Sequence, residues 1–133
     1  MPPTPAREMR LLGLAFGATL VLSLVVLFLP EAPDGGVELP GADKVVHLLL
    51  FGLLATTALR RFGPRPGLLP ALAAYAVASE VGQALVLPGR GGDVVDVAAD
   101  LTGVAVGWAV AHAWARRGAG SVAATSAPDE VTR

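Results

Sequence analysis

Four long apolar segments are the feature that most restricts what this chain can fold into. A helix that crosses a membrane needs about 20 mostly apolar residues. Four segments approach or reach that length: Leu11–Leu29, Val45–Leu59, Leu68–Leu87 and Val94–Trp114. Proline, glycine and charged residues occupy the three connections between them, as is typical of loops. The sequence therefore predicts an all-α fold, an integral membrane bundle of four transmembrane helices.

The composition excludes several other classes of protein. Of 133 residues, 53% are hydrophobic and only 16% are charged, too few charges to cover the surface of a small water-soluble domain. The formal net charge of −1 argues against a nucleic-acid partner, because a general nucleic-acid binder needs a basic face. The chain has no cysteine, which excludes disulfides, thiolate nucleophiles and thiolate metal ligands.

Basic residues are unevenly distributed over the ends of the four segments. One end of the bundle receives seven arginines: Arg7, Arg10, Arg60, Arg61, Arg65, Arg116 and Arg117. The other end receives Lys44 and Arg90. Because basic residues concentrate in cytoplasmic loops, we expect a multi-pass protein of the plasma membrane with both termini in the cytoplasm. The expected organisation is a cytoplasmic segment at residues 1–10, a transmembrane domain at 11–117 and a disordered cytoplasmic tail at 118–133.

Polar residues of the last three segments gather in the outer half of the bundle. At a rise of 1.5 Å per residue, Glu80 and Asp100 lie about 10 Å and 9 Å below the outer ends of their segments. Six other polar residues lie nearer that surface: His47, Gln83, Asp96, Asp43, Lys44 and Asp93, and Arg90 lies in the turn beside them. We therefore expect an outward-facing acidic cleft between the second, third and fourth segments.

The fourth segment carries its acids and its glycines on one face. Asp93, Asp96, Asp100, Gly103 and Gly107 are spaced 3, 4, 3 and 4 residues apart, which keeps them on one side of a helix. The two glycines form a Gly-x-x-x-Gly motif, which allows helix backbones to approach closely. Gly13 and Gly17 repeat that spacing in the first segment and are expected to be the partner surface.

These spaced polar motifs resemble the VanZ-like family. The resemblance covers Gly41 to Gly107 and rests on three motifs in order: Asp43-Lys44-x-x-His47 followed by Phe51, Glu80-x-x-Gln83, and Arg90-x-x-Asp93-x-x-Asp96-x-x-x-Asp100-x-x-Gly103. It implies a small bacterial membrane protein that is an accessory factor in resistance to glycopeptides of the teicoplanin type. The family usually has Asn where this chain has Asp100, which adds an acid to the cluster and weakens a direct transfer of the family's role to that position.

Five carboxylates face few basic groups at this end of the chain. Either some of the acids stay protonated, or a cation lies among them. The first alternative suits hydrolysis or transfer on an envelope lipid or glycan, and the second suits a divalent cation such as Mg²⁺, Mn²⁺ or Ca²⁺. The candidate catalytic residues are Glu80 as an acid, with His47 or Asp96 as a base. The candidate binding residues are Asp43, Lys44, Gln83, Arg90, Asp93 and Asp100, with Lys44 and Arg90 as contacts for a phosphate.

Ordinary structural roles compete with these assignments. Asp43 and Asp93 stand where residues that cap helix N-termini belong, and Glu80 and Asp96 could form interhelical ion pairs. Two other functions stay open: a small transporter or exporter coupled to protons through Glu80, and a structural subunit of a membrane complex. The expected partners are membrane lipids and a lipid-linked cell-wall component or the glycopeptide, and the oligomeric state stays open.

Overall fold

The computed structural model describes residues 5–29, 41–87 and 93–125, which form four helices and no strand in those ranges. The helices are α1 (Pro5–Leu27), α2 (Ala42–Phe62), α3 (Leu68–Val86) and α4 (Val94–Thr125). All four are long and apolar enough to cross a membrane. The prediction of an all-α bundle with four transmembrane helices is confirmed, and the chain is a multi-pass membrane protein.

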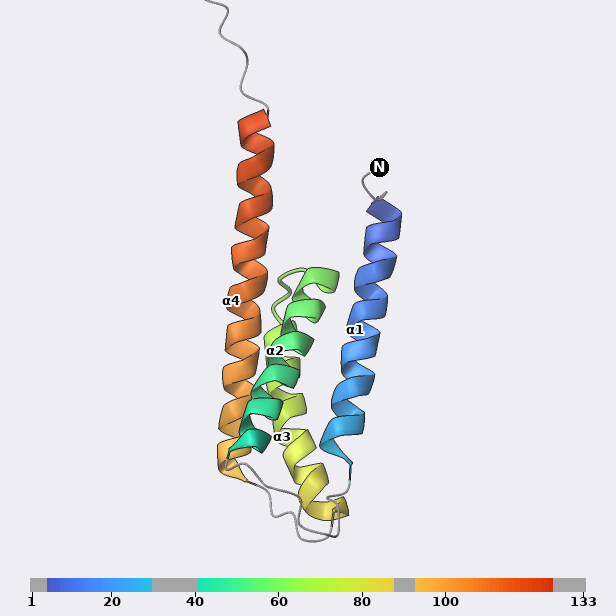
Figure 1. Ribbon diagram of the computed structural model, residues 1–133, viewed down its shortest axis with the longest axis vertical. Coiled ribbons are helices and arrows are strands. Elements are labelled where there is room, and N and C mark those ends of the chain that lie inside the picture. Colours follow the sequence, from blue (N-terminus) through green and yellow to red (C-terminus); the bar gives the residue numbers. More distant parts are fainter. Residues whose placement is uncertain (1–4, 30–40, 88–92, 126–133) are drawn as a thin grey trace, which may run out of the picture.

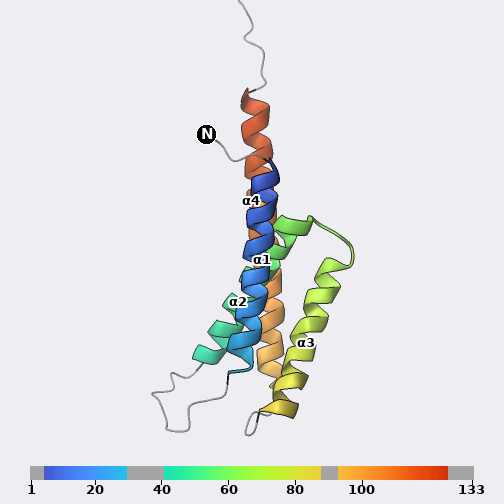
Figure 2. The same ribbon diagram turned by 90° about the vertical axis from the view of Figure 1, so that its right-hand side faces the viewer.

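Successive helices run in opposite directions along the bundle (Figure 1). Helices α1, α2 and α4 form a row with α2 in the middle, and α3 lies on one side of that row (Figure 2). We call the end where α1 and α3 finish and α2 and α4 begin the acidic end, and the opposite end the basic end. The acidic end is therefore built from the N-termini of two helices and the C-termini of the other two.

The interior of the bundle is built around α2. Phe51, Leu54, Ala55 and Ala58 of α2 are at most 1% exposed, and the ring of Phe51 packs against Tyr75 of α3 with centroids 5.4 Å apart. Large apolar side chains cover the outside of the bundle, among them Leu14, Leu85 and Val94. An apolar exterior around a well-packed interior is what lipid contact requires.

Glycines allow α4 to lie directly against α2. A Cβ atom at Gly103 or Gly107 would collide with the α2 backbone at Leu48 or Gly52. The expected partner glycines of α1 are not at this contact: a Cβ atom at Gly13 would meet the side chain of Arg61, and one at Gly17 would have no neighbour within 4 Å. That prediction was wrong because spacing identifies a close-packing face without identifying which helix packs on it.

Hydrogen bonds between side-chain hydroxyl groups join α1 to α2 and α3. Thr19 shares a hydrogen bond of 2.9 Å with Thr57 of α2, and Ser23 shares one of 3.0 Å with Tyr75 of α3. Hydrogen bonds between apolar helices are a common means of association inside a membrane. The sequence signal for this contact was the i, i+4 spacing of Thr19 and Ser23, which places both side chains on one face of α1.

Three helices extend beyond the apolar segments that predicted them. Helix α1 begins at Pro5 instead of Leu11, α2 covers Ala42–Phe62, and α4 continues past Trp114 to Thr125. The residues up to Thr125 are therefore helical, although the sequence predicts disorder from Gly118; residues 126–133 lie outside the described part. Hydropathy falls where charged residues begin, but arginine and alanine are strong helix formers, so the helices continue beyond the apolar core.

Candidate functional site

Three buried ionisable side chains from three helices meet inside the acidic end. His47 of α2, Glu80 of α3 and Asp100 of α4 are 5%, 4% and 0% exposed. His47 Nδ1 lies 2.9 Å from Asp100 Oδ1 and 3.8 Å from Glu80 Oε1. We call these residues the buried trio. The equal depths of Glu80 and Asp100 follow from their positions on antiparallel helices, and His47 completes the group from the middle helix.

Two carboxylate oxygens of the buried trio accept no hydrogen bond from any residue that the structure describes. Glu80 Oε2 accepts one from the backbone N–H of Asp93 at 3.2 Å, whereas Glu80 Oε1 and Asp100 Oδ2 are buried without a hydrogen-bond partner. A buried acceptor without a partner costs about 1–3 kcal/mol, and a charged one costs more. Hydrogen bonds from the described part of the chain therefore satisfy the trio only in part.

A second polar group surrounds Lys44 nearer the surface. Lys44 Nζ lies 2.9 Å from Asp43, 3.2 Å from Asp93 and 2.9 Å from Asp96. We call these four residues the Lys44 cluster. Asp96, a candidate base beside Glu80, is held in this cluster and not in the buried trio. Lys44 already contacts three carboxylates, which competes with the phosphate-binding role that the sequence suggested.

Asp93 connects the Lys44 cluster with the buried trio. Its carboxylate accepts a hydrogen bond from the backbone N–H of Val95 at 2.8 Å, which is the N-cap interaction expected at the start of α4. That hydrogen bond and the one from Lys44 hold the pKa of the Asp93 carboxyl below its ordinary value. The N–H of Asp93 also donates to Glu80, so the cap of α4 helps to position a member of the trio.

The remaining site candidates lie apart from the trio. Gln83, a candidate binding residue, donates a hydrogen bond of 2.8 Å to the backbone carbonyl of Leu27 and so joins α3 to α1. Asp43 does not cap α2, because Gly41 occupies the N-cap position with a φ of 80° and Asp43 lies in the first turn. Arg90 lies outside the described residues.

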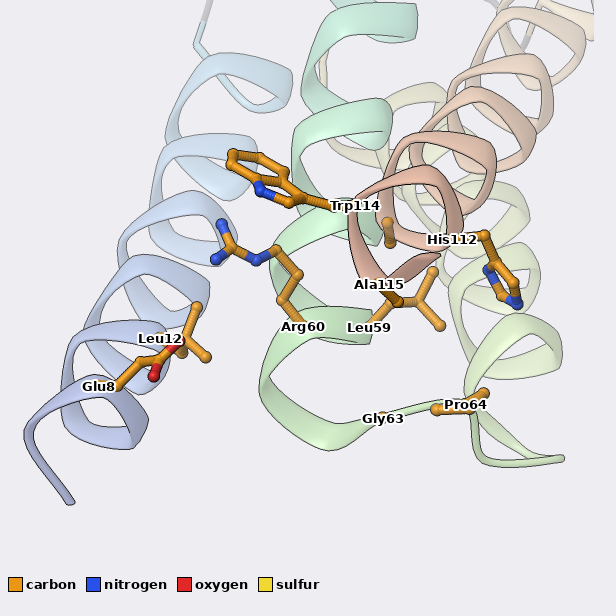
Figure 3. A pocket seen from close by; sticks show the side chains of 10 residues that line it. Glu8, Leu12, Leu59, Arg60, Gly63, Pro64, His112, Trp114 and Ala115 are labelled. Atoms are coloured by element: carbon orange, nitrogen blue, oxygen red, sulfur yellow. The ribbon is translucent and has the colours of Figure 1, made fainter. Parts of the chain in front are cut away.

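A cavity lies at the opposite, basic end of the bundle. It has a volume of about 370 Å³ and is lined by residues of α1, α2 and α4 and of the connection after α2. Figure 3 shows Arg60 of α2 extending between α1 and Trp114 of α4, with its guanidinium carbon 4.2 Å from the centroid of a Trp114 ring. No pattern in the sequence predicts this cavity, and none of its lining residues belongs to the buried trio.

The buried trio brings together three side-chain atoms that can bind a proton or a metal ion. One imidazole nitrogen and two carboxylate oxygens, one from each residue, lie within 4.8 Å of one another. Such a group can hold a proton between its members or can coordinate a cation. These are the two alternatives that the sequence left open for the acidic residues, and the three side chains of the trio lie close enough together for either.

The family of the chain was established by comparison. The family model described as VanZ/LLP1 matches residues 7–115, a range that includes the buried trio and the Lys44 cluster. No curated protein and no solved structure matched the chain. Because the match covers most of the chain and includes residues of all four helices, the chain belongs to the VanZ/LLP1 family.

Proposed function

We propose that this protein is an accessory factor of the bacterial cell envelope in resistance to teicoplanin-type glycopeptides, and that the buried trio binds or modifies an envelope lipid or glycan component. The observation that carries the proposal is the burial of Glu80 and Asp100, each with one oxygen that accepts no hydrogen bond from the described residues. Ionisable groups inside a membrane are costly and commonly mark functional sites. Stability alone gives no reason to keep this arrangement.

The distribution of charge supports a site that faces outward. The seven arginines of the predicted cytoplasmic side all fall at or near the basic end, whereas the trio and the Lys44 cluster lie at the acidic end. With the basic end in the cytoplasm, the acidic end faces the envelope, where lipid-linked cell-wall components and the antibiotic are found. The proposed localisation is the plasma membrane with both termini inside.

The experiment compares resistance in cells that make the full chain or its variants. In a teicoplanin-sensitive bacterium, we expect the wild-type chain to raise the minimal inhibitory concentration and Glu80→Gln to remove that increase. The matched control is Glu8→Gln, the same chemical change at an exposed residue of α1, which should protect like the wild type. Immunoblots of membranes verify equal amounts. Protection by Glu80→Gln equal to that of the wild type contradicts the proposal, as does a wild-type chain that gives no protection.

A proton-coupled transporter is the second candidate. The Thr19–Thr57 pair favours it, because Thr57 lies ten residues beyond His47 along α2 and so places hydroxyl groups nearer the basic end than the buried trio. Its test is proton movement into liposomes that contain the purified protein. A proton flux that Glu80→Gln abolishes and Glu8→Gln preserves supports transport over the accessory role.

A further inference from the structure

We propose that the buried trio is a binding site for one divalent transition-metal cation, with His47 Nδ1 and one carboxylate oxygen each of Glu80 and Asp100 as ligands. This inference deepens the proposed function and rests on it, because it gives the same three residues a cofactor. It assigns the cation to three residues instead of to the acidic end as a whole.

The distances within the trio are close to those of a coordination sphere. Two ligand atoms that bind the same ion at about 2.0–2.2 Å lie about 3–4 Å from each other. The 2.9 Å and 3.8 Å separations from His47 Nδ1 fall in or near this range, and all three ligand atoms lie within 4.8 Å of one another. The ligands come from α2, α3 and α4, so a bound cation would join three helices.

The unpartnered oxygens are a second observation that points to a ligand. A single hydrogen on His47 Nδ1 can satisfy Asp100 Oδ1 at 2.9 Å, but it leaves Asp100 Oδ2 and Glu80 Oε1 without a donor. A cation among the three side chains interacts with both carboxylates at once. It needs no additional donor.

The charge of the trio favours a divalent ion. Two carboxylates in an apolar interior need compensation, and in the described ranges neither Glu80 nor Asp100 pairs with a lysine or an arginine. Lys44 directs its ion pairs to the three aspartates of its own cluster. A divalent cation balances the two negative charges of the carboxylates. A neutral imidazole supplies the third ligand without adding charge.

The ligand types indicate which cation. Imidazole nitrogen together with carboxylate oxygen suits Zn²⁺, Mn²⁺ or Fe²⁺ better than Mg²⁺ or Ca²⁺, which prefer ligands that are all oxygen. Three protein ligands leave a coordination position for water or for an oxygen of a bound lipid or glycan. The backbone N–H of Asp93, which donates to Glu80 Oε2, would orient one ligand from outside the coordination sphere.

The test uses the full chain, purified in detergent without a polyhistidine tag and stripped with a chelator. Equilibrium dialysis against Zn²⁺, followed by elemental analysis, should give one zinc per chain, and Zn²⁺ should raise the melting temperature. We expect Glu80→Gln and the isosteric Asp100→Asn each to weaken zinc binding about tenfold or more and to lose the thermal shift. Glu8→Gln should bind like the wild type.

Two results overturn the metal site: no zinc bound by the wild-type chain, or equal zinc binding by the wild type, Glu80→Gln and Asp100→Asn. Size-exclusion chromatography of the stripped variants shows whether each is folded, and two independent substitutions keep the test informative if one variant aggregates. Equal binding by folded variants means that the zinc is held elsewhere on the chain.

The two proposals fail in distinguishable ways, because the metal assay contains no antibiotic. If zinc binds as expected and Glu80→Gln still protects cells fully, the metal site stands and the resistance role is contradicted. If no zinc binds and Glu80→Gln still loses protection, the resistance role stands and the metal site is contradicted.

Discussion

Glu80 and Asp96 are both acids inside membrane-spanning helices, but their surroundings are opposite. Asp96 lies 2.9 Å from Lys44 and its side chain is 14% exposed. Glu80 is buried. One of its oxygens accepts a hydrogen bond from the N–H of Asp93, and the other accepts none from the described residues and lies 3.8 Å from His47 Nδ1. Removing a charge that is paired and removing one that is unsatisfied have opposite effects on stability.

Melting of two amide variants in chelator-treated detergent solution tests this contrast. We expect Glu80→Gln to leave the free energy of unfolding unchanged or to raise it, by up to about 3 kcal/mol, because an unsatisfied buried acceptor is neutralised. Asp96→Asn should lower the melting temperature, because Lys44 loses an ionised partner. A large loss of stability in Glu80→Gln would instead identify Glu80 as an interhelical contact that holds the bundle together.

The pH dependence of stability should report on Asp93. Because hydrogen bonds from Val95 and Lys44 lower its pKa in the folded chain below the ordinary value of 3.8, the ionised Asp93 stabilises the fold above that value. The contribution is lost as the pH falls through the lower, folded pKa. Asp93→Asn keeps a capping side chain and removes the charge. Its melting temperature should be below that of the wild type at pH 7 and should converge on it in strong acid; an equal difference at both pH values contradicts this.

At the level of helices, the contact between α2 and α4 places the buried trio. Gly103 and Gly107 lie one and two turns beyond Asp100 on α4 and bring its backbone against Gly52 and its neighbours on α2. The same contact sets the distance between Asp100 and His47, which lie 2.9 Å apart. Close packing of small residues therefore determines the geometry of the site.

Alanine substitutions at two glycines separate packing from helix propensity. Gly107→Ala should destabilise the chain by about 1–3 kcal/mol, because its Cβ would collide with the α2 backbone. Gly17→Ala introduces the same methyl group on α1 with no neighbour within 4 Å, so it should stabilise by about 0.4–1 kcal/mol. Thermal unfolding of both variants measures the difference. Equal stability of the two variants would mean that α4 does not pack on α2 through this face.

For the whole molecule, the two ends of the bundle differ in charge. The buried trio and the Lys44 cluster lie at the acidic end. Arg60 lies at the basic end, where it lines the cavity of Figure 3. In the proposed orientation, the basic end faces the cytoplasm. This orientation decides whether the trio can meet envelope components.

Single-cysteine labelling measures the orientation directly, since the natural chain has no cysteine to react. Ala42→Cys places a thiol at an exposed position of the acidic end, and Gly118→Cys places one at an exposed position near the basic end. A membrane-impermeant maleimide should label Ala42→Cys in intact cells and Gly118→Cys only after lysis. The reverse pattern would place the trio on the cytoplasmic side and contradict the proposed function.

The number of helices and the depth of the acids could be predicted from the sequence. Both depend on local quantities: the length of an apolar segment and the rise of 1.5 Å per residue. These placed Glu80 and Asp100 at one level, and the helical period placed Asp93, Asp96 and Asp100 on one face of α4. The start of α1 and the end of α4 lie beyond the predicted segments. The apolar residues stop there, but the hydrogen bonds of the helix backbone continue.

The pairing of side chains depended on the tertiary structure. His47 meets Asp100, while Asp96 meets Lys44, although both aspartates lie on the same face of one helix. Gln83 turns toward α1, and the glycines of α4 pack on α2. Spacing along a helix specifies a face, but the rotation of each helix about its axis and the choice of its neighbour arise only when all four helices pack together.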